Sequence, residues 1–241
     1  MHALWTTIFY NPLYNVLIFF TSVIPFHDIG FSVIALTILV KLALFPITKK
    51  SIITQVKQRA MEGAIEEIKK QYPDKQEQAK KTFELYKKNK FNPFSSCLLV
   101  LIQFPILIAL IYVMQGIATN ASALYSFVHM PEYLNTNFLS LIDVSKPSIL
   151  LAVLAGLSQF VQFRLAMPPK KAAPVEPDDS FKGQLQKNMQ MQMQYFMPIL
   201  IIFVGMKFSG AVALYWITSN IFTIIQEWSL RRHKQELVVI K

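Results

Sequence analysis

Residues 29–47 read IGFSVIALTILVKLALFPI, and this stretch decides the fold class. An α-helix of this length rises at about 1.5 Å per residue and nearly spans the roughly 30 Å hydrocarbon core of a bilayer. Lys41 is the one charged residue within the stretch. The sequence therefore predicts a transmembrane helix that holds a cation among aliphatic side chains.

Apolar and basic segments alternate along the chain. The 241 residues are 53% hydrophobic, yet the formal net charge is +10, a combination that is unusual for a soluble globular domain. Further apolar segments are long enough for membrane helices, or nearly so. We therefore predict an all-α polytopic membrane protein with five transmembrane helices, at residues 29–47, 93–118, 148–163, 189–208 and 210–229.

Basic residues predict the orientation of these helices, because Lys and Arg collect in cytoplasmic loops. Of the 24 Lys and Arg, 21 fall in three segments, residues 48–92, 164–188 and 230–241. Lys146, in the loop 119–147, and Lys207 fall on the opposite side. The N-terminus is thus expected outside and the C-terminus, a basic tail, in the cytoplasm of a bacterial cell.

The N-terminal segment, residues 1–28, is apolar and aromatic but is broken at Asn11-Pro12. No basic region precedes it, so a signal peptide is not expected. We interpret Leu13 to Ile24 as an interfacial helix on the outer surface. A sixth transmembrane helix is the alternative, although the charge distribution requires an odd number.

Residues 48–92 form a soluble insertion with a net charge of +6. Helical periodicity on both sides of Tyr72-Pro73-Asp74 predicts a cytoplasmic helical hairpin, because Pro-Asp is a turn signal. Its surface either faces water and lipid headgroups or docks acidic clients or ribosomal RNA. The segment 164–188, rich in Pro, Ala and charge, is expected to be flexible. The candidate docking residues are Lys69, Lys70, Lys80, Lys81, Arg231 and Arg232.

Polar residues recur at similar depth in the predicted membrane helices. Such groups need partners or water in hydrocarbon, and a shared hydrated cavity would supply both. Two alternatives stay open: each polar group bonds only a neighbouring helix, or Lys41 extends its ammonium to the interface. The candidate cavity residues are Lys41, Thr37, Gln103, Gln159, Tyr215, Trp216, Ser219 and Asn220.

Several function classes compete for such a cavity. A solute or ion transporter is the alternative to be weighed most seriously, but no internal repeat is visible and no acidic residue lies in the middle of a predicted helix. A passive scaffold would tolerate the loss of Lys41. An enzyme is not expected, since the four histidines are scattered, Cys97 is alone, and no metal or phosphate-loop motif occurs. We predict no cofactor, no metal and no small-molecule substrate.

Four segments, in this order and spacing, resemble the YidC/Oxa/Alb membrane insertases over nearly the whole chain. They combine a cation within the first helix, an Asn-Pro entry with Gln-x-Pro, a Met-Pro and a Ser-Gly hairpin that leads into Leu-Tyr-Trp. The segments are SVIALTILVKLALFPITKK, KNKFNPFSSCLLVLIQFPILIALIYV, MQYFMPILI and FSGAVALYWITSNIFTIIQ.

The resemblance implies an insertase and chaperone that accepts nascent membrane proteins in a hydrophilic groove open to the cytoplasm and to lipid. By position, Lys41 matches the groove cation, Thr37 and Gln103 the polar lining, and Tyr215 and Trp216 an aromatic pair that contacts clients. The implied partners are nascent membrane proteins and the bilayer, with the ribosome and the Sec translocon as further candidates.

Three features depart from the family. The cation is Lys where Arg is usual, Lys207-Phe208 replaces a Pro before Ser-Gly, and we expect neither a large extracytoplasmic domain nor a long basic tail within these 241 residues.

Overall fold

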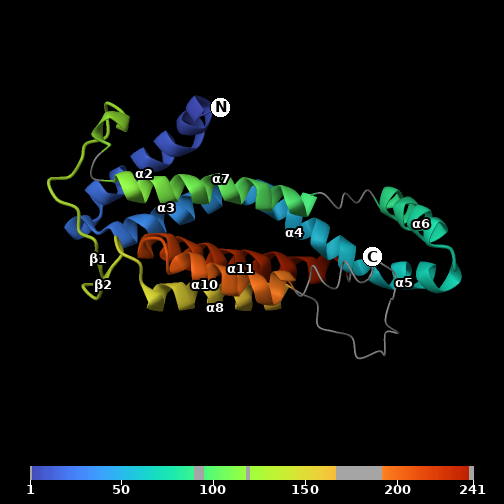
Figure 1. Ribbon diagram of the computed structural model, residues 1–241. Coiled ribbons are helices and arrows are strands. Elements are labelled where there is room, and N and C mark those ends of the chain that lie inside the picture. Colours follow the sequence, from blue (N-terminus) through green and yellow to red (C-terminus); the bar gives the residue numbers. More distant parts are fainter. Residues whose placement is uncertain (1, 90–94, 118–119, 167–191, 239–241) are drawn as a thin grey trace.

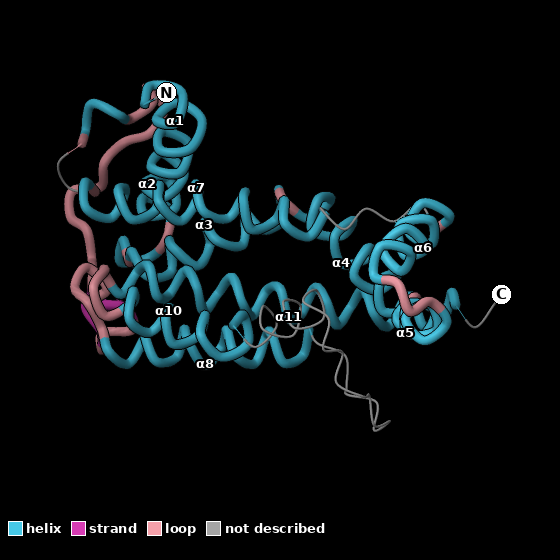
Figure 2. The backbone as a smooth tube through the Cα atoms, turned by 45° about the vertical axis from the view of Figure 1, so that its right-hand side comes forward, coloured by secondary structure: helices cyan, strands magenta, loops and turns pink. Residues whose placement is uncertain are grey.

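The computed structural model describes residues 2–89, 95–117, 120–166 and 192–238. Most of these residues are helical, and two strands of two residues each are the only named strands in these ranges. Long helices run side by side in one bundle, and a helical hairpin projects from one end (Figures 1 and 2). The all-α class predicted from the sequence is confirmed.

The chain begins with helix α1 (His2–Trp5), a π-helical segment (Thr6–Tyr10) and helix α2 (Asn11–Val23). A short turn at Pro25–His27 leads into α3 (Ile29–Ala43), which packs against α2. Asp28 caps α3, because its carboxylate accepts a hydrogen bond from the backbone N–H of Phe31 at 3.1 Å.

The predicted helix at 29–47 is interrupted. Helix α3 ends at Ala43, and α4 (Phe45–Ala60) continues after Leu44 at an angle of 62°. Pro46 explains the bend, because proline has no N–H to donate to the carbonyl of Leu42. No single helix in the described ranges is both long and apolar enough to cross a bilayer. The bent pair Ile29–Ala43 and Phe45–Thr54 passes that test together, by length and composition.

Beyond α4, the insertion forms the hairpin of α5 (Glu62–Gln71) and α6 (Lys75–Lys88). The turn lies where Pro-Asp stands in the sequence, and Asp74 caps α6 by accepting a hydrogen bond from Gln76 N at 3.1 Å. Residue 48 belongs to α4, which leads directly into α5, so the hairpin itself begins at Glu62 (Figure 1).

The remaining elements complete the bundle. Helix α8 packs against both α10 and α11, and α11 also packs against α3. In chain order these elements are α7 (Ser95–Gly116), a 3-10 turn (Ala121–Ala123), β1 (Asn137–Phe138), β2 (Ile142–Asp143), α8 (Ile149–Ala166), a π-helical segment (Gln192–Phe196), α10 (Met197–Gly205) and α11 (Gly210–Val238).

Two predicted segments differ from these bounds or lie outside them. Helix α11 continues to Val238, well past the predicted helix end at 229, so most of the predicted basic tail is helical. Its polar residues can extend the helix because nothing in its sequence, neither Pro nor Gly, breaks it after Gly210. The predicted flexible loop falls mainly on residues 167–191, which lie outside the described residues.

At one end of the bundle, α2 packs closely against the loop that follows α7. Asn15 is 2% exposed; its amide donates to the carbonyls of Asn11 and Ala123, both at 2.8 Å, and its side-chain oxygen accepts from Tyr125 N at 2.6 Å. Tyr14, fully buried, donates its hydroxyl to the Ile117 carbonyl at 3.3 Å. These bonds join the N-terminal helix to the loop and give both polar atoms of the Asn15 side chain a partner.

Replacing Asn15 with Ala removes the acceptor of Tyr125 N and a donor to Ala123 O. We expect the free energy of unfolding to fall by about 1–3 kcal/mol, measured in detergent micelles, because partly buried backbone groups lose their partners. Ser22→Ala is the control, since that hydroxyl is exposed and bonds the Phe19 carbonyl of its own helix. Equal losses in both variants would contradict the role given to Asn15.

Candidate functional site

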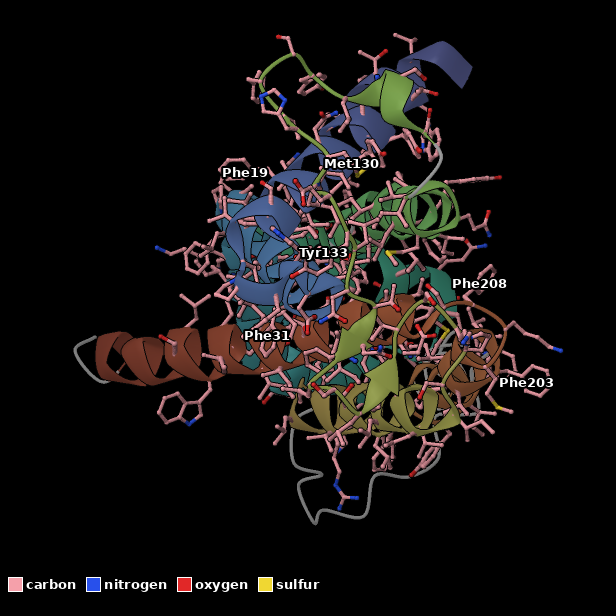
Figure 3. All side chains as sticks on the ribbon, turned by 90° about the vertical axis from the view of Figure 1, so that its left-hand side faces the viewer. Phe19, Phe31, Met130, Tyr133, Phe203 and Phe208 are labelled. Atoms are coloured by element: carbon pink, nitrogen blue, oxygen red, sulfur yellow. The ribbon has the colours of Figure 1, made fainter. Side chains whose placement is uncertain are left out.

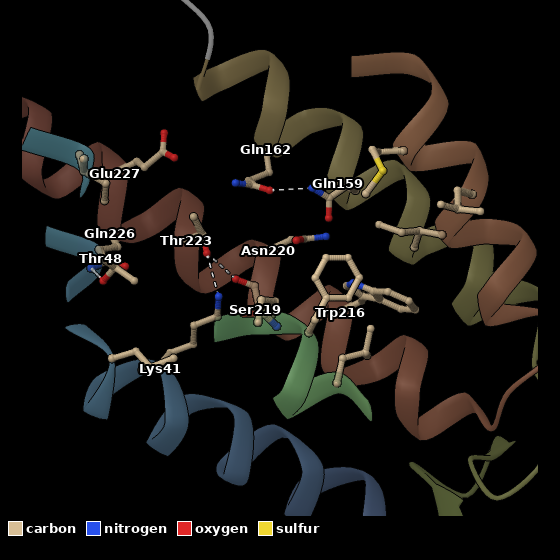
Figure 4. Close-up of a pocket in the computed structure, with 18 of the residues that line it drawn as sticks. Lys41, Thr48, Gln159, Gln162, Trp216, Ser219, Asn220, Thr223, Gln226 and Glu227 are labelled. Carbon is tan, nitrogen blue, oxygen red and sulfur yellow. Dashed lines mark hydrogen bonds between the residues drawn. The ribbon is translucent and has the colours of Figure 1, made fainter. Parts of the chain in front are cut away.

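A cavity of about 370 Å³ lies at the bend between α3 and α4, enclosed by α7, α8, α10 and α11. Polar side chains line part of its wall (Figure 4). They are Lys41, Thr48, Gln103, Gln159, Gln162, Trp216, Ser219, Asn220, Thr223, Gln226 and Glu227. Apolar residues line the rest, namely Leu44, Ile52, Phe104, Leu107, Met197, Leu200, Ile201 and Val204.

The Lys41 ammonium reaches across the cavity to α11. Its Nζ donates to Thr223 Oγ1 at 3.3 Å, and that hydroxyl donates in turn to the carbonyl of Ser219 at 2.8 Å (Figure 4). An ammonium has three N–H donors and one threonine oxygen accepts one of them, so water or a bound group in the cavity can accept the others. The arrangement places Lys41 toward the cavity rather than along α3 toward the end of the bundle.

Other polar side chains around the cavity bond each other across helices. Gln226 of α11 donates to Thr48 of α4 at 2.5 Å, which joins the two helices beyond the bend. Asn220 donates to Ser158 of α8 at 2.9 Å. These contacts match the alternative in which polar groups bond neighbouring helices. In this bundle, the same side chains both bond neighbours and line the cavity.

Two predicted cavity residues do not line it. Thr37 is fully buried and donates its hydroxyl to the Val33 carbonyl of its own helix at 2.6 Å. Tyr215 is 2% exposed, and its hydroxyl accepts a hydrogen bond from the Gln103 amide. Each lies four positions before a cavity residue of its own helix, Lys41 or Ser219, so it is on the same side of the helix but one turn nearer the packed end, where it is buried. Trp216, the next residue, does reach the cavity.

The structure also brings residues outside the list of candidate cavity residues to the site. The predicted hairpin starts at Thr48, but the bend turns this residue back to the cavity. Gln162, Thr223, Gln226 and Glu227 also contribute to the lining. Thr223 and Gln226 are among the polar residues that recur along the predicted helix 210–229, and Gln162 is among those of the predicted helix 148–163. Glu227, eight positions after Ser219, shares the same side of α11.

The cavity is amphipathic, which limits what it can do. Helices α8 and α11 contribute amides, hydroxyls, Trp216 and Glu227, α10 contributes only Met197 and aliphatic side chains, and α4 and α7 contribute both kinds. Within the described residues, no group of three or more His, Cys, Asp or Glu could hold a metal ion. The arrangement suits a polypeptide segment with both polar and apolar side chains better than a small hydrophilic solute.

Lys70, Lys80 and Lys81, three of the predicted docking residues, lie on the hairpin and do not line the cavity. Lys70 and Lys80 are exposed on the hairpin, whereas Lys81 pairs with Glu84 at 3.1 Å, and this hydrogen bond raises the pKa of Lys81. Lys69 belongs to α5, but its side chain, like those of Arg231 and Arg232 in α11, is outside the described part of the structure. The hairpin thus presents exposed cations at Lys70 and Lys80.

The cavity predicts a pattern of thiol labelling. In a Cys97→Ser background, cysteine at Thr223 should react with a membrane-impermeant maleimide added from the hairpin side. Cysteine at Thr37, which is fully buried only about one helical turn from Lys41, should stay unlabelled. The measurement is the labelled fraction in oriented membrane vesicles. Equal labelling at the two positions would mean that the cavity is not open to water on that side.

Comparisons with known proteins agree with this architecture. A family model described as 60Kd inner membrane protein matches residues 19–236. Curated relatives include the membrane protein insertases YidC of Francisella tularensis subsp. novicida (strain U112), subsp. holarctica (strain LVS) and subsp. tularensis (strain SCHU S4 / Schu 4). Each is 32% identical over 233 residues, which cover 92% of this chain and 37% of the relative. The chain thus spans little more than a third of those relatives, and it belongs to the 60Kd inner membrane protein family, the family of YidC and the Oxa insertases.

Proposed function

We propose that this chain is a membrane protein insertase, which takes nascent membrane proteins into the cavity at Lys41 and releases them into lipid. The observation that carries the proposal is the half-buried Lys41 ammonium, which reaches into a cavity lined by both polar and apolar side chains. The family and the names of the curated relatives support the same function.

The cavity would lower the cost of moving polar segments into a bilayer. A polar group without partners in hydrocarbon costs several kcal/mol, and a charged residue at the centre of a membrane helix costs about 2.5–3.5 kcal/mol or more. A wet cavity shortens the dry path, and the positive charge of Lys41 attracts an acidic residue of the client. The apolar wall at Leu200, Ile201 and Val204 can receive the apolar side of the same client.

We also propose that five membrane crossings surround this cavity: the bent pair α3–α4, then α7, α8, α10 with the preceding π-helical segment, and α11. Large apolar side chains are exposed along the bundle, including Leu154 and Leu157 on α8 and Ile199 and Phe203 on α10, as expected where helices face lipid. The positive-inside rule then places the hairpin in the cytoplasm and the packed end with α2 outside.

The basic hairpin is the proposed entry point for clients. Its exposed Lys70 and Lys80 carry positive charge beyond the end of the bundle, where a ribosome or an acidic client segment could dock. A Sec translocon is a further proposed partner on the ground of the family alone. Neither the relatives nor the cavity favours the transporter that the sequence left open.

Substitutions at Lys41 test the proposal in cells depleted of their own insertase. Lys41→Arg should keep activity, because a guanidinium retains the charge and offers more donors. Lys41→Ala should lower the insertion rate of a client with an acidic translocated tail by roughly tenfold, which corresponds to about 1.4 kcal/mol of electrostatic attraction removed. A client of the same length with a neutral tail should be nearly unaffected.

A passive scaffold predicts the opposite result. In that case Lys41→Ala would be harmless or stabilising, since the free energy of inserting a membrane helix is about 2–3 kcal/mol lower with Ala than with Lys at its centre. Equal yields for Ala and wild type on the acidic-tail client would therefore refute the proposed role of Lys41.

The hairpin can be tested by charge removal. Replacing Lys69, Lys70, Lys80 and Lys81 with Gln should weaken ribosome binding to the protein in proteoliposomes. It should also flatten the slope of log affinity against log salt, by up to ~0.7–0.9 for each phosphate group that the hairpin no longer neutralises. Lys146→Gln with Lys207→Gln removes charge from the predicted outer side and is the control. An unchanged salt dependence would mean that the hairpin is not the docking site.

A further inference from the structure

Two turns at the packed end of the bundle hold bulky residues in the left-handed backbone region. Phe26 and His27 have φ of 62° and 51°, and Leu139 and Ser140 have φ of 54° and 57°. In the described ranges these are the four non-glycine residues with positive φ. Such values favour Gly or Asn, because a larger side chain crowds the backbone.

Both turns would have a lower conformational energy with a glycine at the position of positive φ. The first is closed by His27 N donating to the Ile24 carbonyl at 3.1 Å, and a positive φ at its third residue, Phe26, favours Gly. The second is closed by Leu141 N donating to the Phe138 carbonyl at 3.0 Å, where Asn-Gly is the favoured central pair. Phe and Leu at these positions lower stability in isolation, which motivates a search for a compensating contact.

The apolar side chains of these turns are not buried in the protein. The exposed fractions are 77% for Phe26, 56% for Leu139 and 83% for Leu141. The two turns are joined to each other, since Asn135 N donates to the His27 carbonyl at 3.1 Å and its own carbonyl accepts from Ile29 N at 2.9 Å. Figure 3 shows this end of the molecule, with Tyr133 and Phe31 beside it. Both turns therefore expose apolar side chains at the same end of the bundle, and we call Phe26, Leu139 and Leu141 the tip cluster.

The surroundings of the tip cluster indicate which partner covers it. Just after β2, the backbone is tied to the start of α11, because Gly210 N donates to the Lys146 carbonyl at 2.7 Å. Helix α8 then starts with Ile149 and Leu150, which are 66% and 59% exposed. The tip cluster thus lies at the same end as the exposed apolar side of α8, which the proposed function assigns to lipid.

In the sequence, a charged pair lies between Leu141 of the tip cluster and Ile149 at the start of α8. Asp143 and Lys146 form an ion pair at 2.9 Å, and hydrogen bonds from Ser145 and Lys146 lower the pKa of Asp143 below its usual range. A solvent-accessible ion pair flanked by apolar side chains is suited to the headgroup layer, where water and hydrocarbon meet. A protein partner would be expected to leave such a pair at the rim of a larger apolar patch.

We propose that Phe26, Leu139 and Leu141 insert into the outer leaflet, at the boundary between headgroups and acyl chains, and anchor the closed end of the bundle. The inference rests on the proposed membrane location. Because α3 starts at Ile29, beside the anchored turns, the anchor sets the depth of Lys41, which lies roughly 18 Å along the helix at about 1.5 Å per residue.

The test places an environment-sensitive NBD probe on Leu141→Cys in the Cys97→Ser background, reconstituted in phosphatidylcholine–phosphatidylglycerol vesicles. Lipids that carry a doxyl quencher near the headgroup should quench this probe severalfold more than lipids with the quencher near the chain end. Two control probe positions calibrate the quenching. Leu157→Cys, in the middle of α8, should show the reverse order, and Gln76→Cys on the hairpin should respond only to an aqueous quencher.

The outcomes separate this inference from the proposed membrane location. If Leu157 is quenched by the deep lipid and Leu141 only by the aqueous quencher, the bundle is in the membrane but the anchor is wrong. If the Leu141 probe is shielded from both lipid and water, a protein surface covers the tip cluster, which also overturns the anchor. If Leu157 is not quenched by either lipid, the membrane location itself fails.

A second variant distinguishes lipid contact from internal packing. Leu139→Gly relieves the left-handed strain, so the melting temperature in detergent should stay constant or rise. In vesicles the same change removes an inserted side chain, so quenching at Leu141 by the shallow lipid should fall. A drop in melting temperature in detergent would show that Leu139 is retained for packing within the protein.

Discussion

A single ammonium group imposes the main constraint on this bundle. Lys41 stands among aliphatic residues of α3, and a charge there must find polar partners or water. Pro46, little more than one turn further on, bends the chain by 62° and turns α4 aside, so Thr48 returns to face α11. The cation and the bend therefore belong together: the bend opens the space that the cation needs, and Thr223 of α11 supplies one acceptor.

The two ends of the bundle are built in opposite ways. At the end of α2, buried tyrosines and the three hydrogen bonds of Asn15 fill the space between helices, and the first turns of α3 are tightly packed, with Ile29 and Val33 fully buried. At the start of α4, the space between the helices stays open as the cavity, and α4 leads from there to the basic hairpin. A closed outer end and a hydrated inner end would let a polar segment enter from the cytoplasm without opening a path for ions across the membrane.

The sequence predicted the helical class and the family, because long apolar stretches, charge asymmetry and ordered motifs are local properties. It predicted the site less well. Thr37 and Tyr215 carry suitable groups and lie on the correct side of their helices, but how far a cavity extends along a helix depends on neighbours that are distant in sequence. The Thr37 hydroxyl bonds the Val33 carbonyl, and the Tyr215 hydroxyl accepts from Gln103, one turn beyond the cavity. Thr48 was missed for a related reason, since only the angle at Leu44 returns it to the site. Trp216, Ser219 and Asn220 were found because several polar residues share one stretch of α11.

The central claim is that Lys41 attracts an acidic residue of the client inside the membrane, and a charge reversal tests it most directly. The measurement is the insertion yield of two clients that differ at one tail residue, Asp or Lys, with wild type and with Lys41→Glu. If the charges interact, Lys41→Glu fails to insert the Asp client and inserts the Lys client better, and the double-mutant cycle gives a coupling energy of about 1 kcal/mol or more. Independent effects of the two changes, with no rescue of the Lys client, would contradict the claim.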